Sequence, residues 1–149
     1  MKKIKSVLIC VLVLSLCLSV CGCAAKASGP IAEHAWHFSS VQNRKNGEIL
    51  YSSAQDQQTY GGVYAEAELL ELNCEVNSKK ITLKRQSDGQ EWCFDYKLES
   101  EAEGTYYYTV QSNQSAAATV SASDFSDGTT LYTLLLMFED YTLYFYHEQ

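Results

Sequence analysis

The stretch EWCFDYKLE, residues 91–99, decides the fold of this chain. Large apolar side chains occupy its even positions, which are Trp92, Phe94, Tyr96 and Leu98. The odd positions are charged, apart from Cys93. Alternation with a period of two residues is typical of a β-strand with one buried and one exposed face. We therefore expect a strand here, with its even face packed in the core.

Shorter versions of this pattern occur on both sides of that strand. Further strands are expected within 36–39, 49–51, 70–76, 81–84, 106–110, 116–122, 131–138 and 141–147. Turn signals such as Asn46-Gly47, Asp88-Gly89 and Asp127-Gly128 separate them. We interpret the acidic run 99–104 as a solvated loop. The longest loop is expected at 52–65, with room for a short helix around 64–71.

Together these segments predict an all-β protein, an antiparallel meander of about eight strands. All 18 aromatic residues lie after residue 35, and the only proline is Pro30, so the composition favours strands. A meander must protect its edge strands, and closure into a small barrel is the commonest solution. We expect a closed barrel, with an open sheet or a sandwich as the alternative.

The first 23 residues have the pattern of an export signal. Three lysines precede an apolar run at 6–20, which at about fifteen residues is short for a transmembrane helix of roughly twenty. The run ends in Val20-Cys21-Gly22-Cys23, which resembles the lipobox of bacterial lipoproteins: an aliphatic residue at −3, a small one at −1 and Cys at +1. The resemblance implies cleavage after Gly22 and a lipid on Cys23.

Cys17 and Cys21 fit the lipobox less well, because each follows a residue that is too bulky for the −1 position. An ordinary signal peptide cut near Ala25 or Ala27 is the alternative, and an uncleaved anchor is another. Cleavage before Cys23 divides the chain into a signal peptide at 1–22, a flexible tether at 23–32 and a domain at 33–149. Each buried CH₂ of a lipid chain contributes about 0.8 kcal/mol, so two chains anchor the protein almost permanently. We expect it on the extracytoplasmic face of a cell membrane or envelope.

The charge of the mature chain limits its partners. The leader removes three of the eleven basic residues and leaves 8 basic against 18 acidic ones, a net charge of −10. Nucleic acids and anionic lipid surfaces are bound by clustered Lys and Arg. We therefore expect no nucleic-acid partner, and membrane attachment through the lipid alone.

The early strand Ala35-Trp36-His37-Phe38, a longer loop after the first hairpin and then an unbroken meander resemble the small bacterial lipocalin-like lipoproteins. The resemblance covers about residues 33–149, with Ala35 in the place of that family's Gly. It implies a lipocalin-like barrel that binds a small apolar ligand, although a fold alone does not transfer an activity.

No pattern in the sequence points to catalysis. A serine elbow, a Cys–His arrangement and a phosphate-binding Gly loop are all missing, so we expect no enzyme and no cofactor. His34 and His37 are three residues apart and would face opposite sides of a strand, so they could not share a metal. In a closed barrel His37 could approach His147, but we interpret the histidines as exposed and expect no metal site.

Three tyrosines are candidate ligand-binding residues. Tyr107, Tyr144 and Tyr146 lie on faces opposite to their apolar neighbours, and an exposed Tyr ring with its hydroxyl favours contacts with ligands or proteins. Strands covered on both sides would explain them equally well. The sequence therefore leaves two functions open: a binding module for a small apolar molecule, a glycan or a protein, and a structural or protective envelope lipoprotein without a small ligand.

Cys74 and Cys93 are the two cysteines of the predicted domain. Export to an oxidising compartment favours a disulfide. However, the two residues lie on opposite strand faces and two strand spacings apart, about 9.6 Å, whereas disulfide Cα atoms are about 4.4–6.8 Å apart. We therefore predict two free thiols, with Cys74 buried and Cys93 the more reactive.

Overall fold

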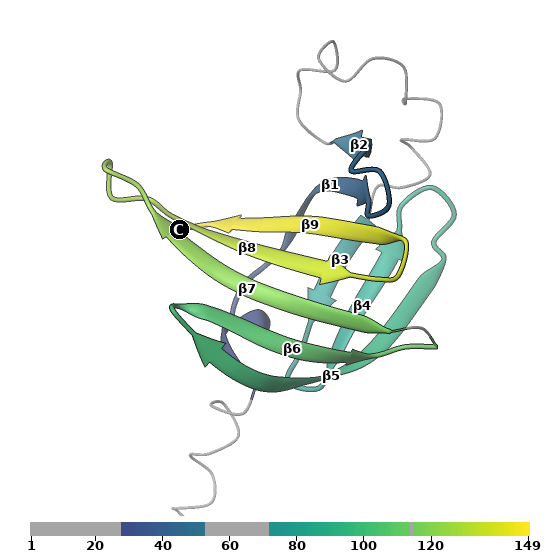
Figure 1. Ribbon diagram of the computed structural model, residues 1–149, viewed down its shortest axis with the longest axis horizontal. Helices are drawn as coiled ribbons and strands as arrows, with labels where there is room; N and C mark the ends of the chain where they lie inside the picture. Colours follow the sequence, from purple (N-terminus) through teal and green to yellow (C-terminus); the bar gives the residue numbers. More distant parts are fainter. Residues whose placement is uncertain (1–27, 53–71, 114) are drawn as a thin grey trace, which may run out of the picture.

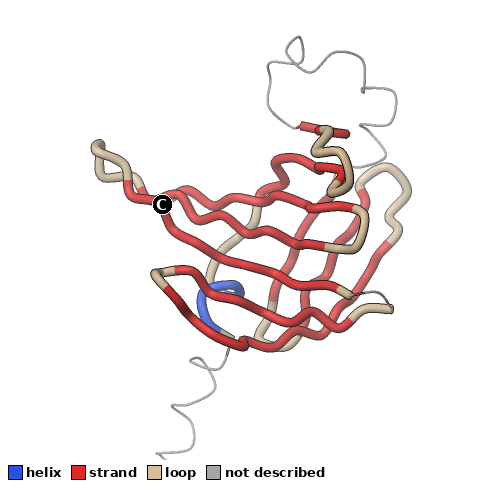
Figure 2. The backbone as a smooth tube through the Cα atoms, in the orientation of Figure 1, coloured by secondary structure: helices blue, strands red, loops and turns tan. Residues whose placement is uncertain are grey.

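The computed structural model describes residues 28–52, 72–113 and 115–149, which form one curled antiparallel sheet (Figure 1). Its strands are β1 (His37–Asn43), β2 (Ile49–Ser52), β3 (Leu72–Val76), β4 (Lys80–Arg85), β5 (Glu91–Ala102), β6 (Thr105–Gln111), β7 (Ala116–Asp124), β8 (Thr130–Met137) and β9 (Tyr141–Glu148). A short 3₁₀ helix, η1 (Gly29–Ala32), precedes them and is the one helix of the described part (Figure 2). The predicted all-β antiparallel meander is confirmed, with nine strands instead of about eight.

The strand order is β2-β1-β9-β8-β7-β6-β5-β4-β3, so each strand from β3 onward pairs with the next along the chain and β9 returns to β1. The predicted hairpin turns are confirmed. In these turns Gly47, Gly89 and Gly128 adopt φ angles of 74°, 72° and 90°. Residues other than glycine adopt such positive φ angles only with strain. The expected loop at 52–65 and the helix near 64–71 fall largely outside the described residues.

The sheet curls into a half-barrel and stays open by strand pairing, which corrects the expectation of a closed barrel. A single antiparallel bridge between Trp36 and Cys74 joins its two ends among the described residues. The register of β1 explains why. One edge of β1 pairs with β9 along its whole length, and β2 pairs with the other edge at Ser40–Gln42. The start of β1 therefore faces β3, and the bridge there is formed by Trp36, the residue just before β1.

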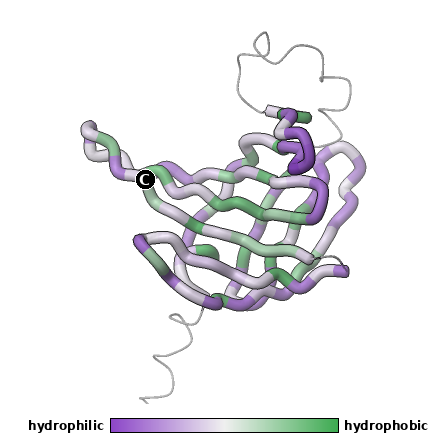
Figure 3. The backbone as a smooth tube through the Cα atoms, in the orientation of Figure 1, coloured by the Kyte–Doolittle hydropathy of each residue, from purple (hydrophilic) through white to green (hydrophobic). Residues whose placement is uncertain are grey.

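The core fills the inside of the curl. Inward-facing residues of β4 and β6 to β9 are almost completely buried, including Ile81, Tyr108, Val120, Leu134 and Phe145. They alternate with exposed or half-buried residues, as the period-two pattern predicts. We call these two sides of the sheet the inner face and the outer face. Figure 3 shows the most hydrophilic residues gathered in the turns between the strands.

Two boundaries differ from those expected. The acidic run 99–104 is mostly strand: β5 continues to Ala102, pairs Glu101 with Tyr106, and turns only at Glu103 and Gly104, whose φ angles are 52° and 74°. A β-bulge between Leu98 and Ser100 bends β5 at this point and lets the strand follow the curl. Charge alone did not distinguish a solvated loop from an exposed strand end.

The second boundary is that of the tether. The sequence places residues up to 32 in a flexible tether, but Ser28 is buried and η1 inserts Ile31 into the core with no exposed surface. An isolated Ile among small residues was the sequence signal for this contact. The folded domain therefore begins no later than Ser28.

Candidate functional site

A cavity of about 570 Å³ opens at one end of the curl. It is lined by Val41, Leu50, Leu72, Leu83, Trp92, Phe94, Ser112, Asn113, Phe138, Tyr141 and Leu143. These residues come from β2, from the beginnings of β3, β5 and β9, from the later parts of β1 and β4, and from the loops that follow β6 and β8. We call this open end the mouth. The volume falls in the range of 300–1,000 Å³ that is usual for small-molecule pockets.

The lining is apolar and aromatic, and none of the described residues that form it is charged. Phe94 and Phe138, both part of the lining, pack against each other with ring centroids 5.4 Å apart. Polar atoms come from Ser112, Asn113 and Tyr141, and the side chain of Tyr141 is 45% exposed. Such a site can bury an apolar body and hold one uncharged polar group near the mouth.

Trp92 and Phe94 lie on the inner face that the sequence identified, but the cavity leaves them half-buried. The sequence assigned both to a filled core, because a period of two shows which side a residue faces and not how full that side is. The guanidinium of Arg85 lies 5.4 Å from the centre of the Trp92 ring, within cation–π distance. Its charge is paired with Asp88, and hydrogen bonding to Arg85 lowers the pKa of that carboxyl to about 2.

At the opposite end of the curl, η1 packs into the core beside a second cavity, of about 450 Å³; we call η1 the plug. The Ile31 N–H lies 3.4 Å from the Tyr108 hydroxyl oxygen and donates to it, and the Ile31 carbonyl accepts a 2.8 Å hydrogen bond from Trp36 Nε1. Burial raises the pKa of Tyr108 to about 12, so this hydroxyl stays neutral at physiological pH. The backbone N–H and carbonyl of Ile31 thus both bind side chains of the core and hold the plug in place.

The three candidate tyrosines lie on the outer face, and none of them lines the cavity. Tyr107 and Tyr144 belong to one row across the sheet, separated by Thr119 and Leu135 on the strands between them. Tyr146 pairs with Thr133 and His37 in the next row. The exposed fractions are 42% for Tyr107 and 38% for Tyr146, while the half-buried Tyr144 donates a 2.8 Å hydrogen bond to Gln42.

The contacts of the histidines differ from the expected approach of His37 to His147. His37 does not approach His147; its ring lies 5.5 Å from that of Tyr146 on the outer face. His34 instead stacks on His147 at 4.8 Å and on Tyr132 at 4.0 Å, beside the plug. Burial, and then the neighbouring His147, lower the pKa of His34. In the described part of the chain, no group of three or more His, Cys, Asp or Glu side chains could hold a metal.

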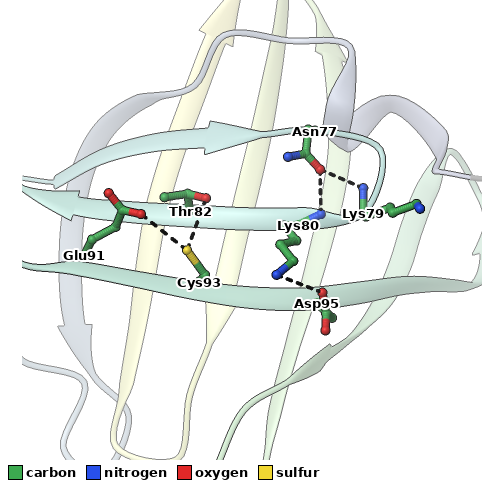
Figure 4. A network of polar contacts seen from close by, with 7 residues as sticks. All are labelled: Asn77, Lys79, Lys80, Thr82, Glu91, Cys93 and Asp95. Atoms are coloured by element: carbon green, nitrogen blue, oxygen red, sulfur yellow. Dashed lines mark hydrogen bonds and ion pairs between the residues drawn. The ribbon is translucent and has the colours of Figure 1, made fainter.

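The prediction of two free thiols is confirmed: Cys74 is buried and Cys93 is exposed. Cys74 pairs with Leu83 across β3 and β4, while Cys93 pairs with Thr82 across β4 and β5, so the two thiols point to opposite faces. Cys93 lies on the outer face, and its sulfur is 3.7 Å from Thr82 Oγ1 and 3.5 Å from a carboxylate oxygen of Glu91. Figure 4 shows Cys93 between these two side chains. Burial raises the pKa of Cys74 to about 12, which keeps its thiol protonated and inert.

The comparisons with known proteins give no information about function, so the cavity is the main evidence for it. No protein-family model, curated protein or solved structure matches this chain. Within the described ranges, no helix has the length and apolar character that crossing a membrane requires. Cys23 and the expected signal peptide at 1–22 lie outside the described residues.

Proposed function

We propose that this protein is a lipoprotein, anchored through Cys23 on the extracytoplasmic face of the cell membrane or envelope, whose lipocalin-like domain binds a small apolar molecule. The observation that carries the proposal is the cavity of about 570 Å³ with its uncharged aromatic lining. A stable core normally fills its interior with side chains at crystal-like density. A cavity of this size, open at one end in the described part of the chain, instead favours a ligand.

The lipocalin-like part of the proposal draws on the arrangement of the sheet. An antiparallel meander curls around an apolar interior, carries the plug at one end and the cavity of about 570 Å³ at the other, and brings Trp36, just before β1, against Cys74 of the edge strand β3. The early tryptophan of the resemblance holds the plug through its Nε1 hydrogen bond. Ligand binding without catalysis or a cofactor is the role that fits this interior.

A second candidate function is an envelope lipoprotein that makes protein contacts without a small ligand. The outer face of β6 to β9 favours it, because Tyr107, Leu135 and Tyr144 form an uncharged row there. Surface tyrosines are common at protein interfaces. The two functions use opposite faces of the sheet, so substitutions can separate them.

Native mass spectrometry of the mature chain, released from membranes of its own host, tests the ligand. We expect an added mass, of the size of a small organic molecule, that is lost on denaturation. The same measurement on a Leu50→Asp chain should show the mass reduced or gone, because the substitution places a charge in the lining. A mass retained fully by Leu50→Asp but lost by Tyr107→Asp would move the site to the outer face.

The anchor is tested by replacing Cys23 with Ser. The substitution removes the only atom that can accept the lipid at a cleavage site after Gly22, so we expect the protein to move from the membrane to the soluble extracytoplasmic fraction. Cys21→Ser is the matched control and should leave the protein on the membrane. A Cys23→Ser protein that stays membrane-bound would contradict the assignment of the lipobox.

A further inference from the structure

The chain enters the domain at the plugged end. Ser28 is buried and leads directly into η1, and a Cβ added to Gly29 would lie 2.6 Å from the Tyr108 hydroxyl and 3.6 Å from Leu98 Cδ2. The point where the preceding residues are attached is therefore fixed against the inner faces of β5 and β6. Any anchor before Ser28 holds the domain by this end.

The mouth lies at the other end of the same strands. Along β5, Leu98 is next to the plug and Trp92 lines the cavity, six residues away, which corresponds to about 20 Å of strand. Cys23 stands five residues before Ser28. Five residues span at most about 18 Å when fully extended. The extended tether is therefore shorter than the length of strand between the plug and the cavity.

Two basic side chains beside the mouth are paired with carboxylates, while Arg44 donates a 2.7 Å hydrogen bond to the carbonyl oxygen of Phe138. Lys45 is paired with Asp140 at 2.7 Å, and Arg85 is paired with Asp88. Paired surface charges have weak fields, and basic clusters are what draw a surface to anionic lipid.

From this geometry we propose that the mouth points away from the membrane that anchors the protein, so that the apolar ligand is taken up from the aqueous side and is not drawn out of that membrane. The inference rests on the proposed function, because it needs both the lipid on Cys23 and a ligand in the cavity. It fixes the source of the ligand: molecules dissolved in water or delivered by another carrier.

A barrel lying on its side is the arrangement to exclude. The outer face of β6 to β9, with Tyr107 and Tyr146, could rest on the headgroup region, where tyrosine is favoured. Both ends of the sheet would then be equally near the bilayer. Ser78 and Ser87 separate these arrangements, because they lie in the exposed turns at opposite ends of β4, the first at the plugged end and the second at the mouth.

The experiment uses the lipidated mature chain in phosphatidylcholine vesicles, in a Cys93→Ser background that removes the exposed thiol. Ser78→Cys and Ser87→Cys each receive the same small fluorophore, and a lipid with a nitroxide on its headgroup acts as the quencher. We expect at least twofold stronger quenching at position 78 than at position 87. Dissolved iodide should quench both labels alike, because both turns are exposed. Equal lipid quenching, or stronger quenching at position 87, would overturn the proposed orientation.

A second arm follows loading of the neutral fluorophore N-phenyl-1-naphthylamine. It is supplied either in the vesicles that carry the protein or in separate protein-free vesicles. Uptake through water should proceed at the same rate in both cases at equal total lipid. Faster loading from the protein's own vesicles would overturn the aqueous route. Absence of binding in both cases would count against the proposed ligand function, while the quenching result would still report the orientation.

Discussion

Trp36 Nε1 donates a 2.8 Å hydrogen bond to the carbonyl oxygen of Ile31 and so ties the plug to the first strand. Trp36 also forms the bridge to Cys74 that joins the two ends of the sheet. One buried residue thus links the plug, β1 and β3. The hydrogen bond and the bridge hold the plugged end of the domain together, and the cavity of about 570 Å³ lies at the other end.

The plug predicts that Gly29 tolerates no side chain. Gly29 has a φ of 61°, and an added Cβ would lie 2.6 Å from the Tyr108 hydroxyl. Gly104→Ala is the control, since its φ is 74° and nothing lies within 4 Å of an added Cβ. Backbone strain of this kind costs about 1–3 kcal/mol, and overpacking adds a further 1–3 kcal/mol or so. Urea denaturation should show a larger loss of unfolding free energy for Gly29→Ala than for Gly104→Ala; equal losses would contradict the plug contact.

The cavity predicts that aromatic residues of the inner face contribute unequally to stability. Phe145 is fully buried against Phe38, so Phe145→Ala should cost about 3–5 kcal/mol. Phe94 faces the cavity and is half-buried, so Phe94→Ala should cost less than about 2 kcal/mol. Lys97→Ala, on the outer face, should cost under about 0.5 kcal/mol. A loss at Phe94 as large as that at Phe145 would mean that the cavity is filled by side chains.

The two thiols should differ sharply in reactivity. In the chain without its leader and anchor, residues 24–149, a thiol reagent at pH 8 should modify one cysteine per molecule in the folded state and two in denaturant. Cys93→Ser should abolish the reaction of the folded protein, because burial raises the pKa of Cys74 to about 12. Rapid reaction of both thiols in the folded Cys93-containing chain would show that the end of the sheet at Trp36 and Cys74 opens readily.

The His34–His147 stack predicts a loss of stability in mild acid. The folded-state pKa of His34 is lowered, mainly by burial and also by His147, while Glu33 opposes the shift. The unfolded chain therefore binds more protons just below the unperturbed pKa of about 6.5, and unfolding free energy should fall as the pH drops from about 6.5 through the folded-state value. His34→Gln should flatten this dependence, and His37→Gln, on the outer face, should not. An unchanged slope in His34→Gln would rule out this group as the cause.

The period-two pattern predicted most of the fold. Turn glycines and strands with apolar alternation determine local structure and the facing of each residue, so β5 and the cysteine faces were predicted correctly. Closure was not, because it depends on which edge of β1 is occupied. The pairing of β2 with Ser40–Gln42, a contact between chain segments that alternation does not encode, leaves only the start of β1 free to face β3, next to the Trp36–Cys74 bridge.

The cavity was harder to predict than the sheet. Trp92 and Phe94 have the same sequence pattern as fully buried residues such as Tyr108 and Val110, and only the three-dimensional curl leaves space beside them. The outward tyrosines were placed on the right face, but a face does not specify a ligand site. The stack of His34 on His147 was missed because the two residues are brought together by the plug, which the sequence treated as tether.

Binding of a neutral apolar fluorophore tests the central claim most directly. N-phenyl-1-naphthylamine is titrated into residues 24–149 and into two charge-adding variants, Leu50→Asp in the cavity and Tyr107→Asp on the outer face, after circular dichroism shows that both are folded. We expect saturable binding with one site per chain, weakened at least tenfold by Leu50→Asp and changed less than twofold by Tyr107→Asp. Absent binding, or binding weakened by Tyr107→Asp and not by Leu50→Asp, would contradict the proposal that the cavity is the ligand site.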